Sequence, residues 1–327
     1  EEDHWPKQWA KYYVERSAED VYNWLVKLGL KFFPAVNWVE RGQYGEGNSL
    51  PRYHILWGTG YRLVERFIEL LQNHKNNQKL EIHYQHKVHD FIRDDGAVVG
   101  CKVLNELNEQ ELEFHASYTI VATGGIGGNL KKVRDNWYKP WGKAPSEMLN
   151  GSHKYADGLL HDVLSDQGAA VTHLDKMWNY AAGIPHPKAS FEGQGLSLIP
   201  CKNALWLDHS GKRIGPEPLV TGFDTNELCR RVSALEQPYT WQLFNWRIAI
   251  KEFAISGSEH NQHIRDRKLF SFLKEALFGN HRLIKQLQSE SDHFLVADDL
   301  PSLVSKMNAL NKDTNVDFHT VEQEVKQ

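Results

Sequence analysis

The chain has 327 residues, with 38 Lys and Arg against 42 Asp and Glu, a formal net charge of −4. Its charges are interspersed, so no basic face broad enough to neutralise a nucleic-acid backbone is indicated, and nucleic acid is excluded as a partner. No apolar run reaches the roughly 20 residues of a membrane span, and the acidic first ten residues are unlike a signal peptide. We therefore expect a cytoplasmic protein of two domains, since domains average about 100–200 residues. Cys101, Cys201 and Cys229 lack CxxC spacing, which predicts reduced, buried thiols.

The first third of the chain predicts two helices separated by a long loop. Apolar residues recur at three- and four-residue steps over residues 9–28, and Gly29 ends that pattern. Residues 33–57 are rich in Gly, Pro and aromatics, which indicates an ordered loop. A second apolar stripe predicts a helix over residues 61–73.

The period then falls to two, which predicts a β-meander. Its expected strands cover 80–84, 87–93, 97–104, 111–116 and 118–122, with a turn at 94–96. The last strand is uniformly apolar, as in a sheet covered on both faces.

Small residues follow that last strand directly, at Ala122, Thr123, Gly124 and Gly125. Glycines at a strand end let the flat or anionic part of a ligand approach the backbone, and ligands of open α/β sheets sit at such ends. A turn that only reverses the chain is the alternative. The GGIGGN stretch also lacks the GxGxxG spacing of a dinucleotide fingerprint.

The second half begins with a short helix over 159–168, stopped by glycine. Residues 183–195 are rich in Pro and Gly, and we place a domain boundary there. Residues 204–214 predict a β-hairpin with Ser210-Gly211 at its turn, and the remainder is mostly helical.

The order of these motifs resembles the FAD-binding dehydrogenases related to fumarate reductase flavoproteins and 3-ketosteroid dehydrogenases. A β-meander, an ATGG strand end at Ala122–Gly125 and a Gly-Asp-Gly-like stretch at Asp157-Gly158 carry the resemblance, and Arg52 and His54 match the Arg-x-His loop of this family. It implies that FAD is the cofactor, that the backbone of Val88 meets the adenine and that Asp157 lies near the flavin.

The resemblance covers the centre of the family only. Its N-terminal GxGxxG strand, whose helix holds the FAD pyrophosphate, has no counterpart in the sequence, and its C-terminal glycine-rich segment would follow Gln327. The implied fold class is α/β: the central part of a Rossmann-like FAD-binding domain with a β-meander over 1–182, and an α+β capping domain over 183–327. We expect FAD not to be held by this chain alone.

In the cap, Arg213 and Glu217 of SGKRIGPE match the GKRFxNE of the family. A surface ion pair in a hairpin is the alternative reading, because such pairs contribute only about 0–1 kcal/mol. Fumarate reductases carry a proton-donating arginine about eight residues beyond the GKR arginine, where this chain has Thr221. Arg230 and Arg231 lie too far along the sequence to be assigned that role.

The Gln-x-His-Pro of dicarboxylate enzymes is also not reproduced, since its place is taken by a stretch with Trp178, Asn179 and Tyr180, followed by His186-Pro187. These departures argue against a dicarboxylate, and the aromatics suit a larger, less polar, steroid-like substrate. Tyr180 and Tyr239 are the candidate proton donors, with Arg213 as the third catalytic candidate. Hydrogen-bonded core tyrosines are the alternative.

His83, His86 and His89 raise the question of a metal site. On one strand His83 and His89 would face one way and His86 the other, so we expect solvated histidines and no metal. The sequence also lacks a Gly-x-Ser-x-Gly elbow, a Walker loop and HExxH.

We therefore predict an FAD-dependent oxidoreductase that moves a hydride between flavin and a substrate carbon, interconverting CH–CH and C=C. Its partners would be a small-molecule substrate and an electron donor or acceptor that the sequence does not identify. A binding or scaffold protein that keeps the flavoprotein fold without turnover is the alternative.

Overall fold

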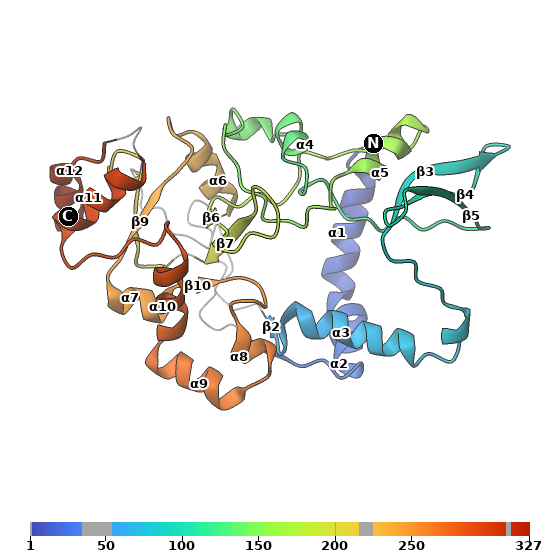
Figure 1. Cartoon of the computed structure of the whole chain (residues 1–327), viewed down its shortest axis with the longest axis horizontal. Coiled ribbons are helices and arrows are strands. Elements are labelled where there is room, and N and C mark those ends of the chain that lie inside the picture. Colours follow the sequence, from blue (N-terminus) through green and yellow to red (C-terminus); the bar gives the residue numbers. More distant parts are fainter. Residues whose placement is uncertain (1, 35–53, 200, 216–224, 312–314) are drawn as a thin grey trace. The chain divides into compact units, whose positions relative to one another are not determined.

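The computed structural model of the protein describes residues 2–34, 54–199, 201–215, 225–311 and 315–327. The chain divides into two compact units, each described below by itself (Figure 1). Unit 1 contains Glu1–Glu69, Lys139–Leu149 and Trp178–Gln327, and unit 2 contains Leu70–Tyr138 and Asn150–Met177. Among the described residues, no helix is long and apolar enough to cross a membrane.

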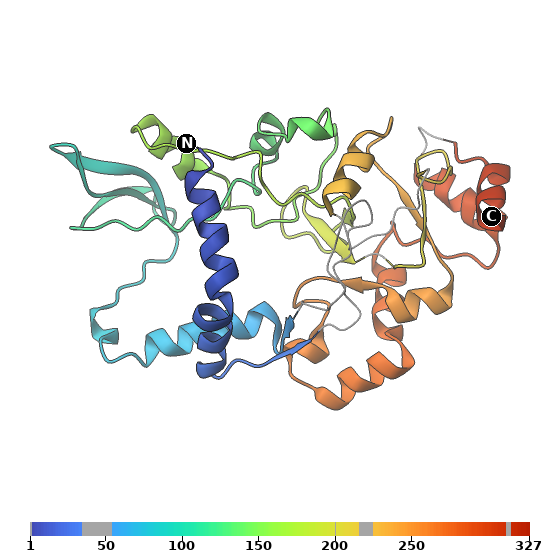
Figure 2. The same ribbon diagram turned by 180° about the vertical axis from the view of Figure 1, so that it is seen from behind.

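Unit 2 is built on an antiparallel meander in the order β3-β4-β5 (Figures 1 and 2). The strands are β3 (His86–Asp94), β4 (Ala97–Asn105) and β5 (Gln110–His115). The predicted turn is confirmed, since Asp95 and Gly96 both adopt positive φ, of 44° and 79°. This backbone twist suits a tight hairpin between right-twisted strands.

Helix α5 (Leu159–Asp166) packs on β3 and confirms the helix expected there. Just past its end, Gln167 donates from Nε2 to Asp90 Oδ1 at 3.0 Å and accepts from Arg93 Nη1 at 3.1 Å. The unit also contains α4 (Leu130–Asp135) and a short 3₁₀ turn, Asn77–Lys79. Its apolar core includes Phe91, Val103, Ile126, Val133 and Leu160, all buried.

Two predicted strands of the meander are wrong. Residues 80–84 and 118–122 form no strand, and Tyr118 and Ile120 are each 90% exposed. Alternation and apolar runs identify a segment that can pair, but pairing needs a neighbouring strand. In the described part of the chain neither segment joins a sheet, so the expected burial of 118–122 on both faces is not seen.

The N-terminal part of unit 1 confirms both predicted helices. Helix α1 (His4–Arg16) continues through a π-helical segment (Ser17–Asn23) into α2 (Trp24–Lys27). Gly29 then leaves the helix with φ 85°, a conformation that glycine adopts without steric cost. Helix α3 (Thr59–Gln72) is anchored to this segment by Arg66, whose Nε donates to the Leu28 carbonyl at 2.7 Å.

Among its described residues, unit 1 contains three small antiparallel sheets and a set of helices. The strands are β1 (Phe32–Pro34) with β2 (His54–Leu56), β6 (Gly183–Pro185), β7 (Gly195–Ile199) and β10 (Ala254–Ile255) in the order β10-β7-β6, and β8 (Leu205–Leu207) with β9 (Trp241–Leu243). The helices are α6 (Thr225–Ser233), α7 (Trp246–Glu252), α8 (Gln262–Arg265), α9 (Leu269–Phe278), α10 (His281–Glu290), α11 (Leu300–Leu310), α12 (Phe318–Lys326) and a 3₁₀ turn, Lys139–Trp141.

The predicted hairpin near Ser210-Gly211 is present as a turn with a single bridge between Leu207 and Arg213. Asp208 closes the turn, because its Oδ1 accepts from the amides of Ser210 at 2.9 Å and Lys212 at 3.0 Å. The regular partner of β8 is β9, from much later in the chain. Local spacing could not reveal that pairing.

Candidate functional site

The glycine segment Ala122–Gly125 is exposed along its whole length in unit 2. Gly124 has φ 79°, and a Cβ there would meet only Ala156 Cβ, at 3.7 Å. A Cβ on Gly125 would have nothing within 4 Å. The backbone of this segment is therefore accessible from solvent, and no side chain packs closely against Gly125.

The residues just after this segment are locked against the loop before α5. The Gly128 amide donates to the Ala156 carbonyl at 2.8 Å, and Asn150 Nδ2 donates to the Gly128 carbonyl at 3.2 Å. A Cβ on Gly128 would lie 2.4 Å from the His153 carbonyl oxygen. Residue 128 must therefore be glycine, because the backbone of the loop before α5 packs directly against it. This contact holds the loop after residue 125 against the loop before α5.

Asp157 and Gly158 begin helix α5. Asp157 Oδ1 accepts from the Leu159 amide at 2.9 Å, and Gly158 has φ 73°. Lys132 Nζ donates to the Gly158 carbonyl at 2.7 Å and also pairs with Asp162. Asp157 is therefore positioned by a hydrogen bond to the start of the helix, in the loop that packs against Gly128.

Val88, the expected adenine contact, is half-buried on β3 and pairs with Val103 on β4. The register shifts between Val88 and Asp90, which leaves His89 as the extra residue of a β-bulge. A bulge locally interrupts the ladder of hydrogen bonds, and here it lies directly beside Val88.

Tyr180 is half-buried in unit 1 and packs on a cluster of Ala182, Trp206, Ile214 and Leu228. Burial, with a smaller contribution from Cys229, raises the pKa of Tyr180 to about 12. The phenol is therefore protonated at neutral pH, as an ordinary tyrosine is. Burial also raises the pKa of Cys229 to about 11. Cys201 and Cys229 are free and buried, as predicted, whereas Cys101 is free but only half-buried, so its predicted burial is wrong.

Arg213 and Tyr239 lie in surroundings different from those of Tyr180. Arg213 is half-buried at the bridge to Leu207. The Tyr239 ring stands perpendicular to that of Trp241, with centroids 5.8 Å apart. Trp241 packs on a separate cluster that contains Leu207 and Val304. Tyr180 therefore packs on one apolar cluster, whereas Tyr239 contacts Trp241 of another.

Several residues from the family comparison fall outside the described part of the chain: Arg52, Glu217 and Thr221. His54 is exposed on β2. Arg230 and Arg231 both bind Glu227, with distances of 2.6 Å and 2.8 Å to its Oε1. Hydrogen bonding to Arg230 first, and then to Arg231, lowers the pKa of Glu227 to about 2.

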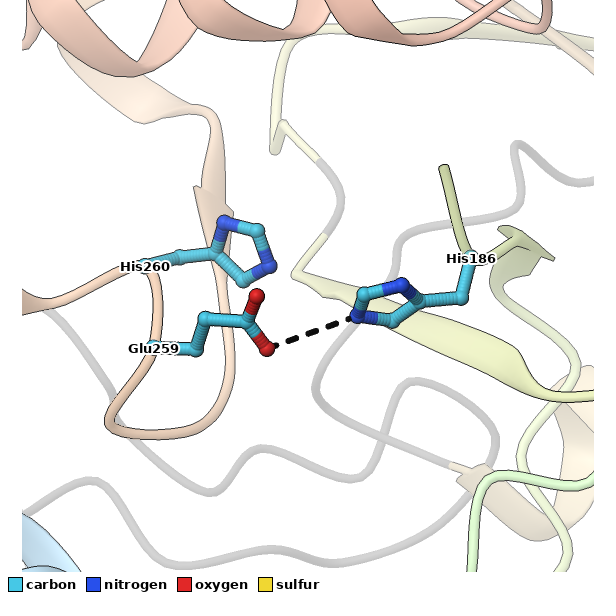
Figure 3. A group of neighbouring side chains, drawn as sticks. All are labelled: His186, Glu259 and His260. Carbon is cyan, nitrogen blue, oxygen red and sulfur yellow. Dashed lines mark ion pairs between the residues drawn. The ribbon is translucent and has the colours of Figure 1, made fainter. Parts of the chain in front are cut away.

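The structure also brings together three residues that the sequence did not single out as a group: His186, Glu259 and His260 (Figure 3). His186 Nε2 lies 3.5 Å from Glu259 Oε2. The His260 side chain is buried, and neither of its ring nitrogens has a hydrogen-bond partner among the residues that the structure describes. Burial lowers the pKa of His260.

The β10-β7-β6 sheet explains why these residues meet. Strands β6 and β10 are both antiparallel to β7, so they run in the same direction and end at the same edge. His186 directly follows β6, and Glu259 and His260 follow β10. Asn261 closes the second loop by donating to the carbonyls of Ile255 at 2.8 Å and Gly257 at 2.7 Å. The His186-Pro187 dipeptide was the only sequence signal.

The strand histidines of unit 2 differ from expectation in one respect. His83 is not on a strand, and its ring lies 5.3 Å from that of His86, beside Phe114. The predicted opposite facing of His83 and His86 is therefore wrong. His89 binds Glu111 at 2.7 Å.

The chain belongs to the FAD binding domain family, whose family model matches residues 1–301. The motif order that suggested an FAD-binding dehydrogenase is thereby confirmed at the level of the family. FAD is the cofactor that membership implies. The exposed backbone at Ala122–Gly125, open above Gly125, fits a flat or anionic part of that cofactor.

Among its relatives is a KsdD-like steroid dehydrogenase of Mycobacterium tuberculosis, 38% identical over 337 residues, which cover 98% of this chain and 59% of the relative. A KsdD-like steroid dehydrogenase of Mycolicibacterium smegmatis is 36% identical over 340 residues, covering 99% and 61%. The chain thus spans about three fifths of the length of these curated relatives.

The open conformation of a flavocytochrome c3 fumarate reductase superposes with a TM-score of 0.57 at 16% identity. The match covers 95% of this chain and 45% of that one. At this identity the likeness concerns the fold alone. The mixed helix and sheet architecture therefore has a solved counterpart across most of the chain.

Proposed function

We propose that the protein containing this chain is an FAD-dependent dehydrogenase that interconverts CH–CH and C=C bonds in a steroid-like substrate. The observation that carries the proposal is the 36–38% identity, across nearly the whole chain, to proteins named KsdD-like steroid dehydrogenases. The departures from the dicarboxylate pattern, with Tyr180 where those enzymes have their polar motif, support a large and weakly polar substrate.

FAD, when bound, supplies the site that accepts or donates hydride. In this proposal the central part of a Rossmann-like FAD-binding domain spans 1–182, with a capping domain over 183–327. The backbone of Val88 and the segment Ala122–Gly125 bind the adenosine end of the cofactor. Asp157 lies near the flavin.

The proton is moved by a residue of the cap. Tyr180 is the leading donor, because it lies in the stretch that takes the place of the dicarboxylate motif and its hydroxyl carries a proton at neutral pH. Tyr239 is the second donor candidate, and Arg213 orients the substrate as a fixed positive charge, since a guanidinium does not lose its proton in proteins.

The test uses the full-length protein. We expect it to purify with a flavin absorption spectrum and to be reduced anaerobically by saturated 3-ketosteroids, with turnover in the presence of an artificial electron acceptor. Succinate and fumarate are the matched dicarboxylate controls and should give neither reduction nor reoxidation. A full-length protein that neither retains nor binds FAD would instead support a scaffold role, and reaction with dicarboxylates alone would contradict the substrate class.

A further inference from the structure

The cluster of His186, Glu259 and His260 has no part in the proposed flavin chemistry. We propose that it is a binding site for a divalent transition metal ion of the zinc class. The three side chains offer two imidazole nitrogens and one carboxylate oxygen, and these atoms all lie within 4.8 Å of one another. Figure 3 shows the three groups converging from two separate loops.

The spacing is close to that of a formed site. Zinc binds such ligands at about 2.0–2.2 Å in a tetrahedron, which places neighbouring ligand atoms about 3.3 Å apart. His186 Nε2 and Glu259 Oε2 are already 3.5 Å apart. The remaining ligand atoms lie up to 4.8 Å from one another, so closure around an ion requires the side chains to approach one another by about an ångström or more.

His260 supplies independent support. It is 4% exposed, and its two ring nitrogens are both buried without a hydrogen-bond partner. Leaving a buried polar group unsatisfied costs about 1–3 kcal/mol. A metal ion beside Glu259 would satisfy one of these nitrogens. Arg282 Nη2 holds the backbone of this residue by donating to the His260 carbonyl at 3.1 Å.

To bind the ion through Nε2, the His186 ring must change its tautomer. Its Nδ1 accepts from the Lys188 amide at 3.1 Å, which puts the proton of the neutral ring on Nε2, facing Glu259. Metal binding moves that proton to Nδ1 and breaks the Lys188 bond. Lys188 is an exposed residue next to the site.

The donor set selects the kind of ion. Two histidines and one glutamate are the ligands of zinc sites that keep a fourth position for water, whereas Mg²⁺ and Ca²⁺ prefer oxygen ligands. The Glu259 side chain is 63% exposed, so solvent reaches the site and can fill that position. The site is therefore open to exchange.

The experiment measures zinc bound by the full-length protein after chelator treatment, dialysis against zinc chloride and desalting. We expect one zinc ion per chain in the wild type and a zinc-dependent rise in thermal midpoint. His260→Gln and Glu259→Gln should each weaken binding at least tenfold and abolish that rise. His281→Gln, at an exposed histidine of the same unit, is the matched control and should bind as the wild type does.

Glu259 is exposed, so we expect Glu259→Gln to fold. This variant can therefore test the proposal even if the substitution at buried His260 prevents folding. Circular dichroism of the metal-free variants identifies that case. Zinc retention by Glu259→Gln equal to the wild type, or no zinc on the wild type above the chelated baseline, would overturn the proposal.

Discussion

At the scale of single residues, Gly128 and Gly125 illustrate two roles of glycine. Gly128 allows close packing against a neighbouring backbone, whereas Gly125 leaves the backbone open to a ligand. Gly128→Ala places a methyl group 2.4 Å from the His153 carbonyl oxygen, which belongs to the backbone and cannot swing aside. We expect a loss of about 1–3 kcal/mol in the free energy of unfolding, the usual cost of overpacking. Denaturant unfolding of the full-length protein measures it.

Gly125→Ala is the matched test of ligand contact. Its Cβ has open space, so we expect the free energy of unfolding of the apoprotein to stay within about 0.5 kcal/mol of the wild type. If the segment faces FAD, the added methyl should weaken FAD binding about tenfold, or 1.4 kcal/mol. Unchanged affinity in a flavin titration would show that Gly125 does not contact the cofactor.

Tyr180→Phe tests the proton donor. General acid catalysis contributes about 10²–10⁴-fold, so we expect kcat to fall at least about 100-fold while flavin binding is retained. Because burial raises the pKa of Tyr180 to about 12, its ionisation should produce no alkaline decline in wild-type turnover up to about pH 10. Tyr239→Phe is the comparison, and a large loss there alone would transfer the role to Tyr239.

At the scale of elements, helix α6 (Thr225–Ser233) carries its own acid-sensitive contact. The pKa of Glu227 is lowered to about 2 by Arg230 and Arg231, so the ionised carboxylate stabilises the folded state. A lowered folded-state pKa gives stability that is present above about pH 4.5 and is lost as pH falls toward 2.

Glu227→Gln should therefore lower the free energy of unfolding by about 1–3 kcal/mol at pH 7, and the difference from the wild type should shrink as the pH approaches 2. Chemical denaturation across that range measures both quantities. Glu236→Gln is a control elsewhere in unit 1. A difference that does not depend on pH would mean that the ion pair is not the source.

The elements also show what local sequence patterns can predict. Helices α1, α3 and α5 and the β3-β4-β5 meander were expected within a few residues, because period and glycine stops are local signals. The pairing of β8 with β9 was not expected, since that register depends on residues far apart in the chain. Short strands such as β6 and β10 carry too few residues to show any period.

The candidate site divides in the same way. The glycine segment could be proposed as a site from the sequence because glycine allows close approach to the backbone. The meeting of His186 with Glu259 and His260 could not, since it arises from two strands that share β7 as their neighbour. His186 and Glu259 are more than 70 positions apart in the sequence. They meet only because β6 and β10 end at the same edge of the β10-β7-β6 sheet.

At the scale of the whole molecule, the segment 118–122 is the largest departure from the sequence prediction. Its apolar side chains were expected to be buried in a sheet, yet Tyr118 and Ile120 are each 90% exposed. Large exposed apolar groups generally mark surfaces that another segment or ligand covers. The relatives that this chain matches are longer than the matched region, which spans about three fifths of them.

FAD binding should therefore change the behaviour of this region in the full-length protein. A ligand that binds only the folded state stabilises it by about 2.7 kcal/mol at 100 times its Kd. We expect hydrogen exchange to slow on FAD addition in two peptides, those spanning 118–125 and 155–160. Strand β4 is the internal control, since its amides are already bonded within the sheet.

The distribution of protection decides between two views of the molecule. Protection confined to those two peptides would place the cofactor contact where Gly124 and Ala156 already lie side by side. Equal slowing everywhere would indicate global stabilisation without a local contact, and protection absent from 118–125 would contradict the assignment of Ala122–Gly125 to FAD. Because exchange reports on backbone amides, the result does not depend on turnover and separates cofactor binding from catalysis.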